Sequence, residues 1–209
     1  SFGGYIISAV YIVWLLNLYN FMDGIDGIAG IEAITVAIGG ALLLISNGEA
    51  PQVWVVSIFL AAAVFGFLLW NFPPAKIFMG DVGSGFIGLV LGVLSIQAAW
   101  VAPELFWSWL ILLAVFITDA TITLVRRVFR GEKFYEAHRG HAYQYVSRKL
   151  GTHRPVIIAV GVINIFWLLP LALFVANSML EGVFAMLLSY TPLVGLALYF
   201  RAGAVEPKV

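Results

Sequence analysis

Amide and carboxylate side chains recur at every third residue of the segment NLYNFMDGIDG, residues 17–27. They are Asn17, Asn20, Asp23 and Asp26. On a helix or a 3₁₀ turn this spacing keeps the side chains on one side, and their oxygen atoms are hard ligands that suit Mg²⁺ better than zinc. Two glycines in the segment would let a ligand approach the backbone closely. A plain Asp-Gly turn between helices is the alternative, but two Asn and two Asp in register favour a functional site.

A further acidic group lies in the small-residue segment FMGDVGSG, residues 78–85. Asp81 stands between glycines, so this loop could bring its carboxylate to a metal-bound phosphate. Ser84 could cap the helix that follows, and a helix N-terminus attracts anions. An ordinary capped turn is the alternative. Residues 83–88 also match G-x-G-x-x-G, but no strand precedes them and an apolar helix follows, which argues against a dinucleotide-binding loop.

The third polar segment, EAHRGHAYQ, lies at residues 136–144 inside a long basic stretch. His138, Arg139 and His141 are side chains that donate well to phosphate oxygens. A solvated basic loop with incidental histidines is the alternative, and these residues alone favour neither. His153 precedes Pro155 at the expected start of a helix, where we expect it to be structural.

The composition indicates an integral membrane protein. Of 209 residues, 62% are hydrophobic and 11% are charged, against roughly 25% charged residues in an ordinary soluble domain. The formal net charge is zero, which argues against a nucleic-acid binder, and the chain has no cysteine. Disulfides, zinc–thiolate sites and thiol nucleophiles are therefore excluded.

The expected fold class is all-α, a polytopic membrane protein forming a single transmembrane domain over residues 1–209. About 20 apolar residues span a bilayer as a helix, the form that satisfies every backbone polar group within one segment. Seven stretches qualify, at about 3–20, 27–46, 53–72, 82–102, 105–125, 155–176 and 182–200. Pro170 and Pro192 should kink the last two. Gly88 and Gly92 form a G-x-x-x-G, which predicts a helix-packing face.

Four polar residues fall within these apolar stretches. Asp119 is expected either to face the site or to pair with a basic group of the following loop. Glu32 is expected at the start of its helix, where the helix dipole favours an acid. Asn164 and Gln97 are expected to form hydrogen bonds between helices.

The basic residues predict the orientation. All eleven Lys and Arg fall on one side of the seven helices, and an excess of these residues marks the cytosolic side. That side carries loops at about 21–27, 73–82 and 126–154 and a C-terminal tail at 201–209. Ser1 is then outside and Val209 inside. The three polar segments share this side, so its positive charge reflects either topology alone or an anionic substrate.

Three segments, NLYNFMDGIDGIAG (17–30), FPPAKIFMGDVGSGFIG (72–88) and GEKFYEAHRGHAYQ (131–144), resemble the polyprenyl-phosphate N-acetylhexosamine-1-phosphate transferase family, bacterial glycosyltransferase family 4. The third is closest to the O-antigen and surface-polysaccharide branch. The resemblance implies transfer of a sugar-1-phosphate from a UDP-sugar to undecaprenyl phosphate, with release of UMP. It also implies Mg²⁺, with Mn²⁺ as a possible substitute, and a site on the cytosolic face of the bacterial inner membrane.

By this resemblance, particular residues acquire expected roles. Asp81 and Asn20 would be metal ligands. Asp23, Asp26 and Asp81 would form the catalytic acidic cluster. The expected substrate-binding residues are Asn17, Asn20, His138, Arg139 and His141.

One departure from the family pattern concerns an Asp-Asp-x-x-Asp motif, since no Asp-Asp pair occurs in this chain. The family usually has ten or eleven helices. We therefore expect the chain to be a C-terminal portion of a larger enzyme, inactive by itself. The alternatives are a non-catalytic remnant and a membrane transporter; a transporter predicts an internal repeat and acids near mid-membrane.

Overall fold

The computed structural model describes residues 2–48, 51–132 and 139–204. These residues form helices and loops, and no strand occurs among them, which confirms the all-α class. The helices are α1 (Phe2–Met22), α2 (Ile28–Ser46), α3 (Pro51–Asn71), α4 (Gly80–Val101), α5 (Pro103–Leu112), α6 (Ala114–Phe129), α7 (Ala142–Leu150), α8 (Arg154–Ile163), the π-helical turn η1 (Asn164–Leu168), α9 (Leu169–Ala176) and α10 (Gly182–Tyr199).

The apolar stretches predicted from the sequence correspond to these helices. Among the described residues, six helical segments are long and apolar enough to cross a membrane, or up to seven if the bent pair α5–α6 is one span. The segment α8–η1–α9 forms one of the six. The protein is therefore a multi-pass membrane protein, as its composition indicates.

The prediction of one continuous helix over residues 105–125 is wrong. The chain breaks at Leu113, and α5 and α6 meet at a bend of 70°. The physical reason lies in α6, which carries the buried carboxylate of Asp119. A buried carboxylate needs hydrogen-bond partners, and the bend brings Asp119 against the start of α7.

The spanning segment formed by α8, η1 and α9 is also irregular. A π-helical turn, Asn164–Leu168, ends two residues before Pro170, which lacks a backbone donor. Asn164 Nδ2 donates to Glu32 Oε2 at 2.7 Å and to Thr35 Oγ1 at 2.8 Å. The predicted hydrogen bond of Asn164 between helices is thus confirmed. Glu32, however, lies beyond the first turn of α2, so its expected placement at the helix start is wrong.

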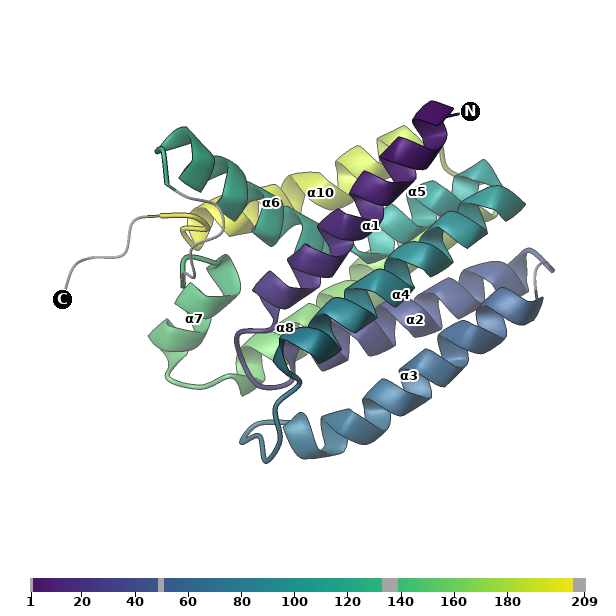
Figure 1. The fold of residues 1–209 in the computed structure, drawn as a ribbon. Helices are drawn as coiled ribbons and strands as arrows, with labels where there is room; N and C mark the ends of the chain where they lie inside the picture. Colours follow the sequence, from purple (N-terminus) through teal and green to yellow (C-terminus); the bar gives the residue numbers. More distant parts are fainter. Residues whose placement is uncertain (1, 49–50, 133–138, 205–209) are drawn as a thin grey trace.

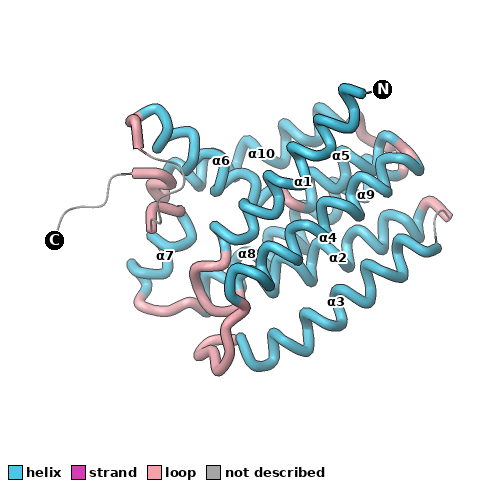
Figure 2. Tube along the Cα trace, in the orientation of Figure 1, coloured by secondary structure: helices cyan, strands magenta, loops and turns pink. Residues whose placement is uncertain are grey.

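Close pairs of helices build the bundle, with α1 against α4 and α2 against α3 (Figure 1). A Cβ added at Gly88 would collide with the carbonyl group of Leu15, and one at Gly92 would lie 3.3 Å from the Leu15 side chain. The predicted packing face is therefore confirmed, because α1 lies directly on it. Loops after α1, α3 and α7 gather at one end of the bundle, away from the N-terminus (Figure 2).

Candidate active site

A cavity of about 250 Å³ opens where these loops meet. Its lining combines the segment after α1, the loop before α4 and the residue preceding α8. The polar side chains in its wall are Asn20, Asp23, Asp26, Asn71, Asp81 and His153. The first two polar segments of the sequence are therefore brought together, as the resemblance implied.

Three carboxylates line this cavity, those of Asp23, Asp26 and Asp81. Asp23 directly follows the last residue of α1, and Asp81 lies in the first turn of α4. Burial, together with the charge of Asp81, raises the pKa of Asp23 from 3.8 to about 7. Two carboxylates that repel each other in a partly buried cavity favour a proton or a cation between them.

The donor set fits Mg²⁺ but not a metal held by a closed cage of protein ligands. Among the described residues, no group of three or more His, Cys, Asp or Glu side chains is placed to hold a metal ion. Mg²⁺ commonly takes one or two carboxylates and completes its shell with water and substrate phosphates. Asp81 supplies one such carboxylate, and Asn20 lines the same cavity. Asn20 Nδ2 lies 3.4 Å from Ser84 Oγ, so its amide oxygen is the atom suited to a cation.

Ser84 does not cap α4 as expected. It lies in the first turns of the helix, and its hydroxyl donates to the carbonyl oxygen of Gly80 at 3.2 Å. The N-cap residue is Met79, which makes no capping bond through its side chain. The hydroxyl of Ser84 instead orients Asn20 across the cavity wall.

Asp26 lines the cavity but is also tied to its walls. Its Oδ2 accepts a hydrogen bond from the Ala75 backbone at 3.0 Å and lies 3.3 Å from His153 Nδ1. The next backbone N–H, at Gly27, donates to Asn71 Oδ1 at 2.9 Å. These contacts join three loops, so Asp26 shapes the cavity whatever its part in chemistry.

His153, expected from its sequence position to be structural, also lies in the cavity wall. Its side chain is 37% exposed and lines the cavity. The backbone N–H of Asp26 donates to its Nδ1 at 3.3 Å. One signal pointed here: His153 lies on the same side of the helices as the acidic segments.

Asn17 lies apart from the other members of its segment. It is not among the cavity-lining residues of the described chain, and its Nδ2 donates to the Val13 carbonyl at 2.7 Å. Helix α1 continues to Met22, and each step of three residues turns a helix short of a full circle. The three-residue repeat therefore drifts around α1, and Asn17 does not reach the cavity that Asp23 lines.

The third polar segment is used differently. His138 lies outside the described residues. Arg139 is exposed, and its carbonyl accepts a hydrogen bond from Arg148 at 3.0 Å. His141 is buried, with Nδ1 3.3 Å from Asp119 Oδ1. Neither Arg139 nor His141 is among the described residues that line the cavity, and their predicted contact with substrate remains a prediction.

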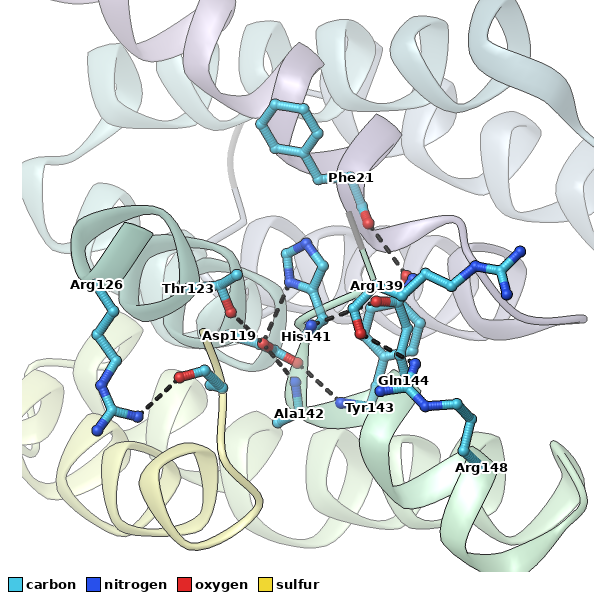
Figure 3. A network of polar contacts seen from close by, with 11 residues as sticks. Phe21, Asp119, Thr123, Arg126, Arg139, His141, Ala142, Tyr143, Gln144 and Arg148 are labelled. Carbon is cyan, nitrogen blue, oxygen red and sulfur yellow. Dashed lines mark hydrogen bonds and ion pairs between the residues drawn. The ribbon is translucent and has the colours of Figure 1, made fainter. Parts of the chain in front are cut away.

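Asp119 is the centre of a second polar cluster (Figure 3). Its carboxylate accepts hydrogen bonds from the Thr123 hydroxyl at 3.1 Å and from the backbone N–H groups of Ala142 and Tyr143 at 3.0 and 3.1 Å. Of the two expectations for this acid, pairing with a basic group of the loop is the one observed, through His141.

Helices of this length and hydropathy, closed at one end by an acidic cavity, define a multi-pass membrane protein with a polar site at the ends of its helices. Residues 1–99 match the model for glycosyl transferase family 4. A probable undecaprenyl-phosphate N-acetylglucosaminyl 1-phosphate transferase of Bacillus subtilis is 30% identical over 134 residues, which cover 63% of this chain and 35% of that protein.

Two further relatives carry related names. A decaprenyl-phosphate N-acetylglucosaminephosphotransferase of Mycobacterium tuberculosis is 33% identical over 51% of this chain and 30% of its own length. An undecaprenyl-phosphate alpha-N-acetylglucosaminyl 1-phosphate transferase of Thermotoga maritima is 31% identical over 54% of this chain and 38% of its own length. The matches thus span about a third of these relatives. These similarities support the family predicted from the motifs, the polyprenyl-phosphate N-acetylhexosamine-1-phosphate transferases.

Proposed function

We propose that the protein transfers an N-acetylhexosamine-1-phosphate from a UDP-sugar to undecaprenyl phosphate, giving undecaprenyl-pyrophosphate-sugar and UMP. The observation that carries this proposal is the cavity at the end of a membrane bundle that is lined by both Asp23 and Asp81, which come from two separate family motifs. The names of the relatives support a polyprenyl-phosphate acceptor and an N-acetylglucosamine-phosphate donor. The finer assignment, to the O-antigen or surface-polysaccharide branch, rests on the third motif.

The chemistry required is compatible with these residues. Phosphoryl transfer depends mainly on positioning and on neutralising charge at phosphate oxygens. Asp81 and Asn20 would hold Mg²⁺, and the ion when bound supplies that neutralisation. Asp23, whose pKa of about 7 lies near the working pH, is suited to accept a proton from the acceptor phosphate. Asp26 keeps the walls of the cavity in place.

The remaining predicted contacts complete the proposal. His138, Arg139 and His141 would donate to the pyrophosphate or nucleotide, and Asn17 would lie at the edge of the substrate site. The cavity would open to the cytosol at the bacterial inner membrane, because all eleven basic residues fall on that side of the predicted topology. A lipid acceptor in the bilayer and a soluble nucleotide donor would then meet at one surface.

The test is a transfer assay in membranes that contain the protein expressed from its complete gene. Undecaprenyl phosphate and a panel of UDP-N-acetylhexosamines are supplied, and both UMP and the lipid-linked product are measured. We expect UMP release that needs both substrates and a divalent cation. Absence of lipid-linked product with every donor, from protein that is folded and inserted, would refute the proposal.

A further inference from the structure

Helix α7 is capped at its N-terminus by its own residues, through a capping box of His141 and Gln144, and also by a residue of another helix. The first two N–H groups of a helix lack partners within it, and those of α7 belong to Ala142 and Tyr143. Both donate to the carboxylate of Asp119, on α6, at 3.0 and 3.1 Å. An acid at this position also interacts favourably with the helix dipole. Asp119 therefore ties the start of α7 to α6.

Tyr143 connects the start of α7 to the segment that lines the cavity. Its side chain is buried, and its hydroxyl donates to the carbonyl oxygen of Phe21 at 3.1 Å, two residues before Asp23. Figure 3 shows this bond beside the Asp119 cluster. A Cβ added at Gly24 would collide with the same hydroxyl and lie 2.7 Å from Gln144 Nε2. The chain on both sides of Asp23, at Phe21 and at Gly24, is thus held close to α7.

The hydroxyl of Tyr143 is a dependable donor. Burial raises the pKa of Tyr143 well above its ordinary value of 10.0, and the charges of Asp119 and Asp23 act in the same direction. The phenol therefore keeps its proton at any pH at which the protein functions. Its bond to Phe21 is a fixed mechanical connection and not a titrating one.

We propose that Asp119 and Tyr143 are positioning residues, which together hold the Asp23 loop in place from α6 through the start of α7. We name this connection the Asp119–Tyr143 link. Neither residue is among the cavity-lining residues of the described chain, so both act through the backbone at residues 21–24. The inference rests on the proposed function in one respect only, namely that Asp23 belongs to the catalytic cluster.

The link explains how the third motif can affect a cavity that its described residues do not line. Displacing a reacting group by about 1 Å can cost on the order of a hundredfold in rate. The loop that carries Asp23 follows the end of α1, and the Tyr143 hydroxyl bonds that end directly. Loss of the Tyr143–Phe21 hydrogen bond should displace Asp23 and leave the binding site for the UDP-sugar intact. We expect kcat to fall roughly tenfold, with KM for the UDP-sugar little changed.

The experiment is hydrogen–deuterium exchange on the full chain in lipid nanodiscs, without substrate, following peptides that cover residues 21–27. The variants are Tyr143→Phe, which removes only the hydroxyl, and Asp119→Asn. The matched control is Tyr145→Phe on the same helix, whose hydroxyl makes no hydrogen bond with the described residues and whose ring lies under Arg201. Thermal unfolding of each variant is recorded alongside.

We expect faster exchange at residues 21–27 in Tyr143→Phe and in Asp119→Asn, and wild-type exchange in Tyr145→Phe. If Asp119→Asn fails to fold, Tyr143→Phe alone decides. Unchanged exchange at 21–27 in a folded Tyr143→Phe would overturn the link. Because exchange is measured without turnover, this result is separate from the transfer assay: an inactive wild type refutes the proposed function, and the exchange data still test the link.

Discussion

The acidic cavity and the Asp119 cluster use the same residue types in opposite ways. In the cavity, Asp23 faces another carboxylate, and burial and that charge raise its pKa to about 7. In the cluster, Asp119 accepts three hydrogen bonds and lies beside His141. An acid surrounded by donors is held in one arrangement, whereas an acid facing an acid has capacity left for a ligand. Partner geometry, more than residue type, separates the candidate catalytic group from the positioning group.

The largest expected effect separates the two regions by activity. Asp81→Ala removes the carboxylate opposite Asp23 and the main predicted metal ligand, so we expect turnover to fall by about 10²–10³-fold. Thermal stability should stay near that of the wild type, because Asp81 supports no described helix contact through its side chain. The measurement is lipid-linked product at saturating and at limiting Mg²⁺.

Glu104→Gln is the matched control for Asp81→Ala. Glu104 also lies in the first turn of an apolar helix, α5, but near the predicted outer end of the bundle. The transfer activity of Glu104→Gln should equal that of the wild type. Near-normal turnover of Asp81→Ala at limiting Mg²⁺ would show that the metal assignment is wrong.

The second largest expected effect distinguishes the Asp119 cluster from the acidic cavity by the free energy of unfolding. Asp119→Ala leaves the N–H groups of Ala142 and Tyr143 without their acceptor in a buried place. Unsatisfied buried donors and a lost helix cap together cost about 3 kcal/mol in the free energy of unfolding. We expect a clear fall in the unfolding temperature in detergent, measured by intrinsic tryptophan fluorescence. A variant as stable as the wild type would show that solvent or lipid replaces the cap.

The fold was largely predictable because apolar length is a local property of the sequence. Hydropathy located every spanning segment, but it could not reveal the 70° break at Leu113. That break depends on what Asp119 contacts, and its backbone partners lie 23 and 24 residues away along the chain. A window of residues read along a helix contains no information about such partners.

The candidate site was predictable in part, for a similar reason. Asp23 and Asp81 stand out through their glycine-rich surroundings, and the resemblance brings their segments together. His153 reaches Asp26 across 127 residues, and Tyr143 reaches Phe21 across 122. Neither pairing has a spacing signature. Asn17 shows the opposite error. Its spacing matches that of Asn20, Asp23 and Asp26, but it lies further back on helix α1 and is not among the described residues that line the cavity.

The pH dependence of stability distinguishes Asp23 from Asp119 more finely. The folded-state pKa of Asp23, about 7, lies above its ordinary value of 3.8. Its protonation therefore stabilises the fold fully below about pH 4, and this contribution is lost as the pH rises through 7. Without divalent cations, the wild type should lose stability between pH 5.5 and pH 8, and Asp23→Asn should lose less.

Thermal unfolding of both proteins across that pH range provides the measurement. Because the two proteins differ only at residue 23, the difference between their curves reports the contribution of the Asp23 carboxyl, including its repulsion with Asp81. Adding Mg²⁺ at pH 8 should raise the stability of the wild type more than that of Asp23→Asn. Parallel curves for the two proteins would show that Asp23 does not carry the raised pKa.

The smallest effect tests whether the Asp119 cluster works through its carboxylate or through its backbone partners. Thr123→Val keeps the shape of a fully buried side chain and removes one donor to Asp119 Oδ1. The two N–H groups of α7 keep their acceptor, so we expect a loss of only about 1 kcal/mol in the free energy of unfolding. Transfer activity and exchange at residues 21–27 should match the wild type, because the cap that fixes Tyr143 is intact. A rate defect as large as that of Tyr143→Phe would instead mean that the orientation of the Asp119 carboxylate, and not the helix cap alone, positions the Asp23 loop.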